Sequence, residues 1–229
     1  MVRPRFPDGG QTPVCKTRGV YRPAHFDIDD PAQLHQVMAD IGSAHLVTIG
    51  PDGLDSTLLP FLVDPERGPL GSLVGHLARG NPQWREADGR PALAILTGPQ
   101  GYVSPGWYPS KSENHKVVPT WNYVVVHAHG ELVVQDDPDT VSSIVRRLTD
   151  RHEADLEQPW SVDDAPPEFV EAMVRGVVGI ELRITRLEGK AKLSQNRPAT
   201  DAAGVVAGLE SRGAADQAVA AAMRQRGMG

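Results

Sequence analysis

The amino-acid sequence predicts an α+β domain built around an antiparallel β-barrel with flanking helices. Short apolar segments of strand type follow one another closely, separated by turn sequences rich in Asp, Gly and Pro. Amphipathic helical segments stand before and after this strand cluster instead of alternating with single strands. With 229 residues, 40% of them hydrophobic, the chain can bury one large core. We therefore expect a flexible leader over residues 1–19, a barrel domain over 20–197 and a C-terminal helical segment over 198–229.

The first helix is expected over residues 31–41. Asp30 is placed to cap it, Pro31 suits the first helical position, and Gly42 ends it. Apolar residues recur at helical spacing within it: Leu34, Val37, Met38 and Ile41. Strands bounded by turn residues are expected over 44–49, 56–63, 70–77, 92–97 and 123–134.

The last third of the chain is mainly helical. Asp137-Pro138 begins a helix whose apolar face includes Val141, Ile144 and Leu148. A shorter helix over 166–175 and a final barrel strand over 177–184 follow. The Ala-rich sequence from residue 198 onward predicts helices that Gly213 interrupts, with a frayed end.

Composition and charge argue against several classes of protein. A formal net charge of −6 disfavours broad attraction to nucleic acid, which needs a basic surface. No apolar run approaches the roughly 18 residues that a membrane span requires. The first twenty residues lack the apolar segment of a secretory signal. The single cysteine, Cys15, allows no internal disulfide, so we expect a cytoplasmic protein.

The segment GHLARGNPQW (75–84) joins the end of a strand to an expected helix start at Asn81. The start of a helix offers free N–H groups and a partial positive charge, which favour phosphates and carboxylates. Arg79 adds a full positive charge. The alternative interpretation is a capped helix with one surface arginine.

Two further segments could contact a flat ligand. Residues 101–111 hold three large aromatic side chains in an expected Gly/Pro loop, with Lys111 placed to face an anionic group. The aromatics could equally lock this loop onto the barrel. Residues 187–197 combine two lysines and an arginine with hydrogen-bonding side chains, which favours an anion. The alternative there is a solvated loop.

His127 and His129 lie two residues apart on an expected strand, so their side chains point to the same face. Such a pair could bind a metal, but the sequence indicates no Cys or acidic cluster to complete the ligand set. A structural role at a barrel face or subunit interface is the favoured interpretation.

Together these segments closely resemble the PaiB-like family, described as FMN-binding negative transcriptional regulators. The resemblance covers about residues 20–226 and rests on motifs in the same order. They are VYRPAHF (20–26), GHLARGNPQW (75–84), GPQGYVSPGWYPSK (98–111), VVPTWNYVVVHAHG (117–130), GVVGIEL (176–182) and KLSQNR (192–197). The resemblance implies an FMN-type split barrel that works as a homodimer, with cofactor sites at the subunit interface.

In relatives of this fold, phosphate contacts come from one barrel strand and from the turn after the next strand. Here these segments are residues 56–60 and 76–81. The PaiB-like family usually has His-Leu-Pro in the first of them, whereas this chain has Leu58-Leu59-Pro60. An apolar side chain thus replaces a polar one expected near the cofactor. This departure puts plain FMN binding in doubt.

Piperazate synthases resemble PaiB-like proteins over their whole length but bind heme b in place of FMN. This second resemblance, with Leu58, leads us to expect heme b, with FMN as the alternative. The expected function is a heme-dependent piperazate synthase, which forms an intramolecular N–N bond by dehydrative cyclisation of N5-hydroxyornithine to piperazic acid. The alternative is an FMN-binding PaiB-like protein, either a flavin-dependent oxidoreductase or a negative transcriptional regulator.

His76 is the expected axial ligand of the heme iron because it lies inside the cofactor segment and histidine is a common axial ligand. His25, His127 and His129 are the alternatives. The other expected cofactor-binding residues are Thr57, Leu58, Arg79, Asn81, Trp107, Trp121, Ser194 and Arg197. Tyr108 and Lys111 are expected in the catalytic site, where an amino-acid substrate would bind.

Overall fold

A computed structural model describes residues 19–228 of the chain. The predicted leader and Cys15 therefore lie outside the described residues, apart from Gly19. The helices are η1 (Ala24–Phe26), α1 (Pro31–Ile41), α2 (Gln83–Ala87), η2 (Pro105–Trp107), α3 (Lys111–Asn114), α4 (Pro138–Glu153), η3 (Val162–Asp164), α5 (Pro167–Arg175), α6 (Ala199–Glu210) and α7 (Ala214–Gln225). The strands are β1 (Asp27–Ile28), β2 (Ser43–Gly50), β3 (Gly53–Pro60), β4 (Leu62–Asp64), β5 (Ser72–Ala78), β6 (Arg90–Val103), β7 (Thr120–Gln135) and β8 (Val177–Lys192).

All the strands belong to one antiparallel sheet, in the order β3-β2-β6-β7-β8-β5-β4, with β1 paired to β8. β3 and β4 stand at opposite ends of this order, yet only Phe61 separates them in the chain. The sheet must therefore roll up so that its two ends meet. Phe61 is buried at this corner, and its backbone N–H donates to the carbonyl of Gly42 at 2.9 Å. The predicted α+β split barrel is confirmed.

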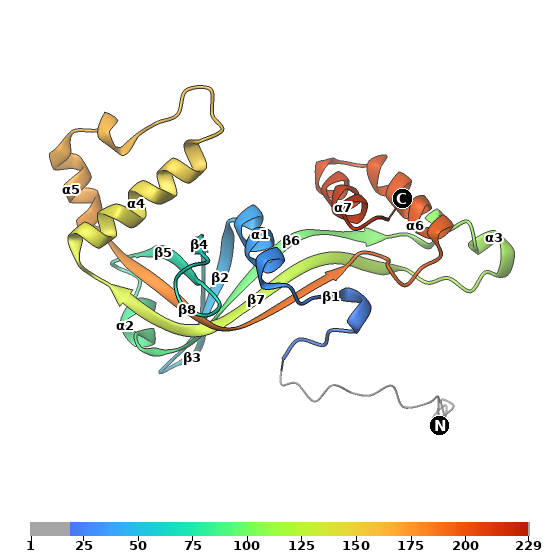
Figure 1. Ribbon diagram of the computed structural model, residues 1–229, viewed down its shortest axis with the longest axis horizontal. Helices are drawn as coiled ribbons and strands as arrows, with labels where there is room; N and C mark the ends of the chain where they lie inside the picture. Colours follow the sequence, from blue (N-terminus) through green and yellow to red (C-terminus); the bar gives the residue numbers. More distant parts are fainter. Residues whose placement is uncertain (1–18, 229) are drawn as a thin grey trace.

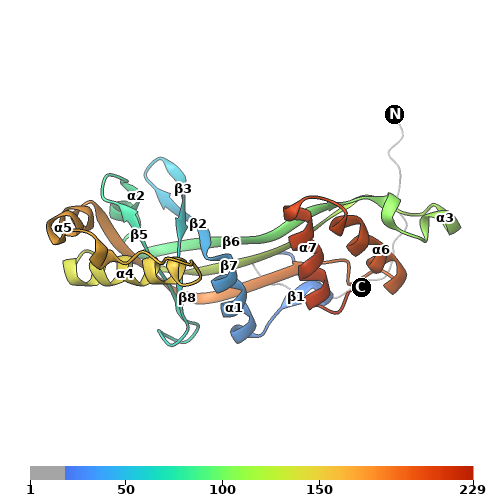
Figure 2. The ribbon, with the colours of Figure 1, turned by 90° about the horizontal axis from the view of Figure 1, so that it is seen from above.

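The three longest strands give the molecule its elongated shape. β6, β7 and β8 have 14, 16 and 16 residues and continue past the barrel as a long arm (Figure 1). Helices α6 and α7 lie along this arm, whereas α4 and α5 lie at the barrel end (Figures 1 and 2). The two ends of the sheet thus carry different helical covers.

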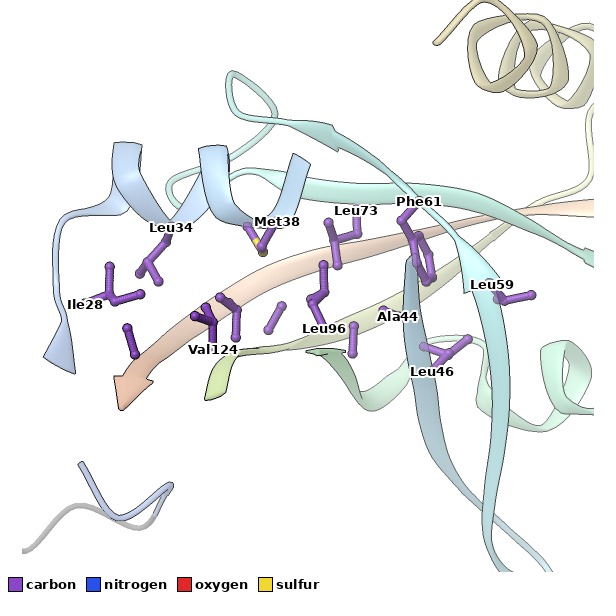
Figure 3. Close-up of a cluster of buried hydrophobic side chains, with 14 of the residues drawn as sticks. Ile28, Leu34, Met38, Ala44, Leu46, Leu59, Phe61, Leu73, Leu96 and Val124 are labelled. Atoms are coloured by element: carbon purple, nitrogen blue, oxygen red, sulfur yellow. The ribbon is translucent and has the colours of Figure 1, made fainter. Parts of the chain in front are cut away.

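Helix α1 closes one side of the barrel core. The helix begins where a neighbouring residue caps it: the Asp30 carboxylate accepts hydrogen bonds from two backbone N–H groups of the first turn. Its end needs a glycine, since Gly42 has φ 71°. The helix buries Leu34 and Met38 against strand side chains that include Leu73, Leu96 and Val124 (Figure 3). The helix predicted over 31–41 is confirmed.

Three predicted boundaries are wrong, each because strand pairing extends or interrupts an element. The strand predicted over 56–63 is broken at the Phe61 corner. Residues 101–103, predicted as loop, belong to β6, which resumes pairing with β7 after a bulge between Thr97 and Gln100. The strand predicted to end at 184 runs to Lys192, because all of residues 186–192 pair with β7.

Across residues 19–228, no helix is both long and apolar enough to cross a bilayer.

Candidate functional site

One face of the sheet lies opposite α1, α6 and α7, and we call it the outer face; within the described residues, Val20, Tyr21 and Phe26 of η1 contact it beside Glu188, Lys190 and Lys192. In β2, residues 44, 46 and 48 are buried and residues 45, 47 and 49 point outward, as strand alternation requires. The strand register then places five side chains in one row across the outer face: Leu58, His45, Ile95, His127 and Glu188. Helices α1, α6 and α7 lie on the opposite side of β6, β7 and β8 (Figure 1).

Apolar side chains are exposed beside this row. Leu58 is 60% exposed, and Leu54, which pairs with Ile49, is 79% exposed. Farther along the arm, Tyr102 and Trp121 are cross-strand partners and both are exposed. Soluble chains rarely leave such large apolar side chains together without a ligand or a partner to cover them.

His127, His129 and Glu188 form a compact cluster on the outer face. Nε2 of His129 lies 3.3 Å from Oε2 of Glu188, and one ligand atom from each of the three residues lies within 4.8 Å of the others. The expectation that no acidic residue completes the histidine pair is therefore wrong. Glu188 was missed because the last strand was predicted to end at residue 184, which hid its position opposite His127.

The Glu188 carboxylate is buried and held as an anion. It accepts a hydrogen bond from the backbone N–H of Val20 at 3.3 Å and pairs with the Arg186 guanidinium. Burial raises the pKa of Glu188, but these two partners and His129 outweigh it and hold the pKa below its usual value. Burial is also the main reason that the pKa values of His127 and His129 are lowered.

A cationic group lies next along β8. Lys190 Nζ donates to the carbonyl of Tyr21 at 2.8 Å, and Lys192 Nζ donates to Thr120 Oγ1 and to the carbonyl of Trp121, both at 2.6 Å. No acidic side chain of the described chain forms an ion pair with Lys190, Lys192 or Arg197. Burial, and then the charges of Lys190 and Arg197, lower the pKa of Lys192. These lysines and Arg197 are positioned to attract an anion.

The aromatic segment, residues 101–111, packs against the C-terminal helices. Tyr108 is buried beneath the Arg197 guanidinium, which lies 4.8 Å from the ring centroid. The indole of Trp107 lies against Gly208 of α6. Lys111 is exposed at the start of α3. Ser194 shares a buried hydrogen bond with Asn122 at 3.0 Å. These contacts favour the interpretation in which the aromatics lock the segment in place.

Thr57 and Asn81 meet on the inner side of the sheet. Asn81 Nδ2 donates to Thr57 Oγ1 at 3.0 Å, and Thr57 Oγ1 donates to the buried Gln83 side chain at 2.6 Å. Thr57 and Leu58 are consecutive strand residues, so their side chains lie on opposite faces of β3. One ligand on a single face therefore does not contact both.

Arg79 is fully engaged within the chain. Its guanidinium binds both carboxylate oxygens of Asp136, at 2.5 and 3.1 Å, and the carbonyls of Arg175 and Val177. The hydrogen bond from Arg79 and the charge of Arg79 lower the pKa of Asp136. This pairing joins the end of β5 to β7 and β8 and leaves less of the arginine charge for a phosphate.

His76 lines a separate apolar cavity of about 220 Å³ at the barrel end. The cavity walls come from the α4–α5 region and include Trp160, Phe169 and Met173. Nδ1 of His76 is buried and has no hydrogen-bond partner among the described residues. Burial lowers the pKa of His76. His25, the remaining alternative axial ligand, is exposed on η1 beside Phe26.

The predicted site residues therefore lie in several separate places in one chain. His76 lies at the barrel end, Thr57 and Asn81 lie beside α2, and Tyr108 and Lys111 lie near the tip of the arm, at the opposite end of the sheet (Figures 1 and 2). Sequence reasoning did not find the part of the outer face that holds His45 and Glu188.

The barrel and its outer sheet face define a class of protein: a split barrel with a broad sheet surface that is partly apolar and partly cationic. The chain belongs to the FMN-binding domain family, since residues 20–186 match the family model described as "Putative FMN-binding domain". This confirms the family resemblance found in the sequence.

Three relatives extend this result. The chain is 28% identical over 193 residues to the protease synthase and sporulation protein PAI 2 of Bacillus subtilis, covering 84% of this chain and 90% of that protein. It is 31% identical over 207 residues to an uncharacterized protein of Emericella nidulans, covering 76% and 82%. An uncharacterized protein of Aspergillus fumigatus is 32% identical over 217 residues, covering 76% and 83%.

Two solved structures share the fold. One is the flavocytochrome Anf3 from Azotobacter vinelandii, with a TM-score of 0.53, 12% identity, and coverage of 75% of this chain and 72% of that chain. The other is a conserved hypothetical protein from Mycobacterium tuberculosis, with a TM-score of 0.53, 14% identity, and coverage of 78% and 94%. At these identities the likeness concerns the fold alone.

Proposed function

We propose that this chain is a homodimeric flavin-binding protein that holds FMN on the outer face of its sheet. The observation that carries the proposal is the cationic group of Lys190, Lys192 and Arg197, which has no acidic partner in the described chain. A phosphate would relieve the mutual repulsion of these charges and supply acceptors for their free hydrogens.

The surrounding side chains fit the rest of an FMN molecule. Trp121 and Tyr102 offer aromatic surface beside Lys192, and Leu58 offers an apolar contact in the row that leads across the sheet. When bound, FMN supplies electron or hydride transfer. The task of the protein residues is to hold the phosphate, exclude water from one side of the ring and orient it. Leu58 suits the apolar part of that task.

A second copy of the chain completes the site in this proposal. The exposed apolar side chains of the outer face are arranged over several strands, which is a surface suited to another sheet. Isologous pairing of two such faces would enclose the ligand between subunits. The acidic net charge of −6 supports a small-molecule role over nucleic-acid binding.

The test is flavin titration of the purified apoprotein, followed by flavin fluorescence and visible absorption. Lys192→Gln and Lys190→Gln should each weaken FMN binding about tenfold or more, since a charge-assisted hydrogen bond contributes about 1.5–3 kcal/mol. Riboflavin, which lacks the phosphate, should lose affinity and become insensitive to both changes. Arg90→Gln, at an exposed position at the start of β6, is the matched control. Equal FMN affinity in all four proteins would refute the proposed phosphate site.

A heme-dependent piperazate synthase is the second candidate, and His76 is the observation that favours it. Its buried Nδ1 without a partner among the described residues is available as a ligand in an apolar cavity, and histidine is a common axial ligand of heme iron. The cavity of about 220 Å³ is smaller than the roughly 300–1,000 Å³ of ordinary ligand pockets. Within one chain it could hold only part of a heme.

Heme would supply an iron centre able to polarise the N–O bond of N5-hydroxyornithine. The cyclisation also needs groups that hold an amino acid, and the predicted residues Tyr108 and Lys111 could reach His76 only from a second subunit, because they lie at the other end of the sheet. The test is hemin titration. A Soret band that weakens in His76→Ala, with conversion of N5-hydroxyornithine to a product lighter by one water, would support this function. A protein that binds FMN and ignores hemin would eliminate it.

A further inference from the structure

We propose that His127, His129 and Glu188 form a binding site for a single divalent transition-metal ion of the Zn²⁺ type on the outer face. None of these three residues belongs to the proposed phosphate group or to the His76 cavity, but His127 and Glu188 lie in the cross-sheet row beneath the proposed flavin site, so the metal site is tested in the flavin-free protein.

The sheet register builds the cluster. His127 pairs directly with Glu188 across β7 and β8, and His129 is two residues farther along β7 on the same face. The register shifts between His129 and Gly130, where Thr185 is the extra residue on β8, and such bulges characteristically redirect side chains nearby. Three potential ligands therefore converge from two neighbouring, central strands, which are rigid supports for a site.

The spacing suits a metal ion after a small adjustment. The three ligand atoms lie within 4.8 Å of one another. The centre of a triangle with that edge is about 2.8 Å from each corner, only about 0.7 Å beyond a Zn–N bond of about 2.1 Å. Rotation of the two imidazole rings can close this gap, since both histidines are half-buried and not packed on all sides.

The contacts of Glu188 leave one oxygen directed at the cluster. Arg186 holds Oε1, while Oε2 lies 3.3 Å from both His129 Nε2 and the Val20 nitrogen. A metal ion would take the place of the proton that His129 and Glu188 now share. Arg186 and Val20 would remain as outer partners that orient the carboxylate.

The ligand types narrow the choice of metal. Two imidazoles and one carboxylate suit Zn²⁺ and other first-row divalent ions, and are a poor set for Ca²⁺ or Mg²⁺, which prefer oxygen ligands. Three protein ligands leave at least one position of a tetrahedral site open, beside the backbone of residues 19–20 that packs on Glu188. Such an open position is typical of catalytic zinc sites, whereas structural sites have four protein ligands.

The experiment is metal titration of the full chain, freed of metal with a chelator, without flavin and without a histidine tag. Zn²⁺ is followed by calorimetry, and Co²⁺ by its visible absorption. We expect one ion per chain for the wild type. His129→Gln and His127→Ala should weaken binding by more than about 100-fold, beyond the 10–100-fold typical for loss of an outer partner, and should remove the Co²⁺ bands.

His45→Ala is the matched control, because His45 lies in the same cross-sheet row but outside the cluster. Circular dichroism shows whether each variant is folded, and the two histidine variants leave the Arg186–Glu188 pair intact. Absence of stoichiometric Zn²⁺ binding by the wild type would overturn the proposal. So would equal losses in His45→Ala and His129→Gln. Since the protein is free of flavin, either result leaves the flavin proposal untouched.

Discussion

His76 is a polar side chain at the border of an apolar cavity. Burial disfavours its charged form and lowers its pKa below the ordinary value, and Nδ1 finds no partner among the described residues to offset this. At a pH below the ordinary histidine pKa, the unfolded chain therefore binds a proton that the folded chain resists binding. The unfolding free energy is therefore unaffected by this proton above the ordinary histidine pKa, and it decreases as the pH falls below it.

Replacement of His76 by Phe should thus flatten the pH dependence of stability. In the ligand-free protein we expect the unfolding free energy of the wild type to fall more steeply between pH 7.5 and 5.5 than that of His76→Phe, as measured by urea denaturation. His127 and His129 contribute equally to both proteins, so they cancel in the comparison. His152→Gln, at an exposed position in α4, should keep the wild-type slope. Identical slopes for all three proteins would contradict the role given to burial.

Single residues also show where sequence reasoning ends. Asp30 and Gly42 could be read as helix signals because a cap acts on backbone groups a few residues away. Glu188 could not be assigned to His127, because their contact depends on the register of two strands about sixty residues apart. The alternation of Glu188, Lys190 and Lys192 with Gly189 and Ala191 was the available signal for a continued strand.

At the scale of elements, the packing of η2 against α6 determines whether the aromatic side chains are held in place or are free to contact a ligand. Trp107 lies so close to Gly208 that a Cβ there would overlap its indole ring, and Gly204 approaches the Trp107 carbonyl equally closely. Two glycines in one helix are unfavourable for helix formation by roughly 1 kcal/mol each. Their presence in α6 is explained by the room that Trp107 needs.

Gly208→Ala should therefore destabilise the protein by about 1–3 kcal/mol, the usual cost of overpacking, instead of stabilising the helix by about 1 kcal/mol. Combining it with Trp107→Ala should remove most of this penalty, because the clash is lost. Gly80→Ala is the control, since a Cβ at Gly80 would meet no atom within 4 Å and the backbone there is not left-handed. Thermal and urea unfolding measure the effect. Stabilisation by Gly208→Ala would show that Trp107 is free to leave α6, as a ligand wall could be.

Element boundaries were predictable to different degrees for a physical reason. Both Asp-Pro helix starts lie where local capping places them, at Pro31 and Pro138. The ends of β6 and β8 depend on pairing with β7, a non-local interaction that local sequence signals indicate only weakly. Glu188, Lys190 and Lys192 of the candidate site lie on the extension of β8, so their place was harder to predict than the barrel.

At the scale of the whole molecule, the long sheet is covered by helices on one side and carries exposed apolar side chains on the other. The helices account for the buried core, in which α1 packs over β4, β6, β7 and β8. Leu58, Leu54 and Ile49 gain nothing from that core, because they point away from it. These side chains gain burial free energy only if a second chain or a ligand covers the outer face. This makes the dimer proposal directly testable.

Leu58→Lys should convert the proposed dimer to a monomer. Leu58 is 60% exposed in one chain, so the change should leave the fold of the chain intact, which circular dichroism can confirm. In the dimer it would bury an unpaired charge in each subunit, at about 3–5 kcal/mol, and raise the dimer dissociation constant about 100-fold or more. Light scattering coupled to gel filtration measures the mass. Leu156→Lys, which adds the same charge at an exposed leucine between α4 and α5, should remain dimeric. FMN affinity should fall with the dimer in Leu58→Lys and persist in Leu156→Lys. A Leu58→Lys protein that is still dimeric would place the subunit contact on another face.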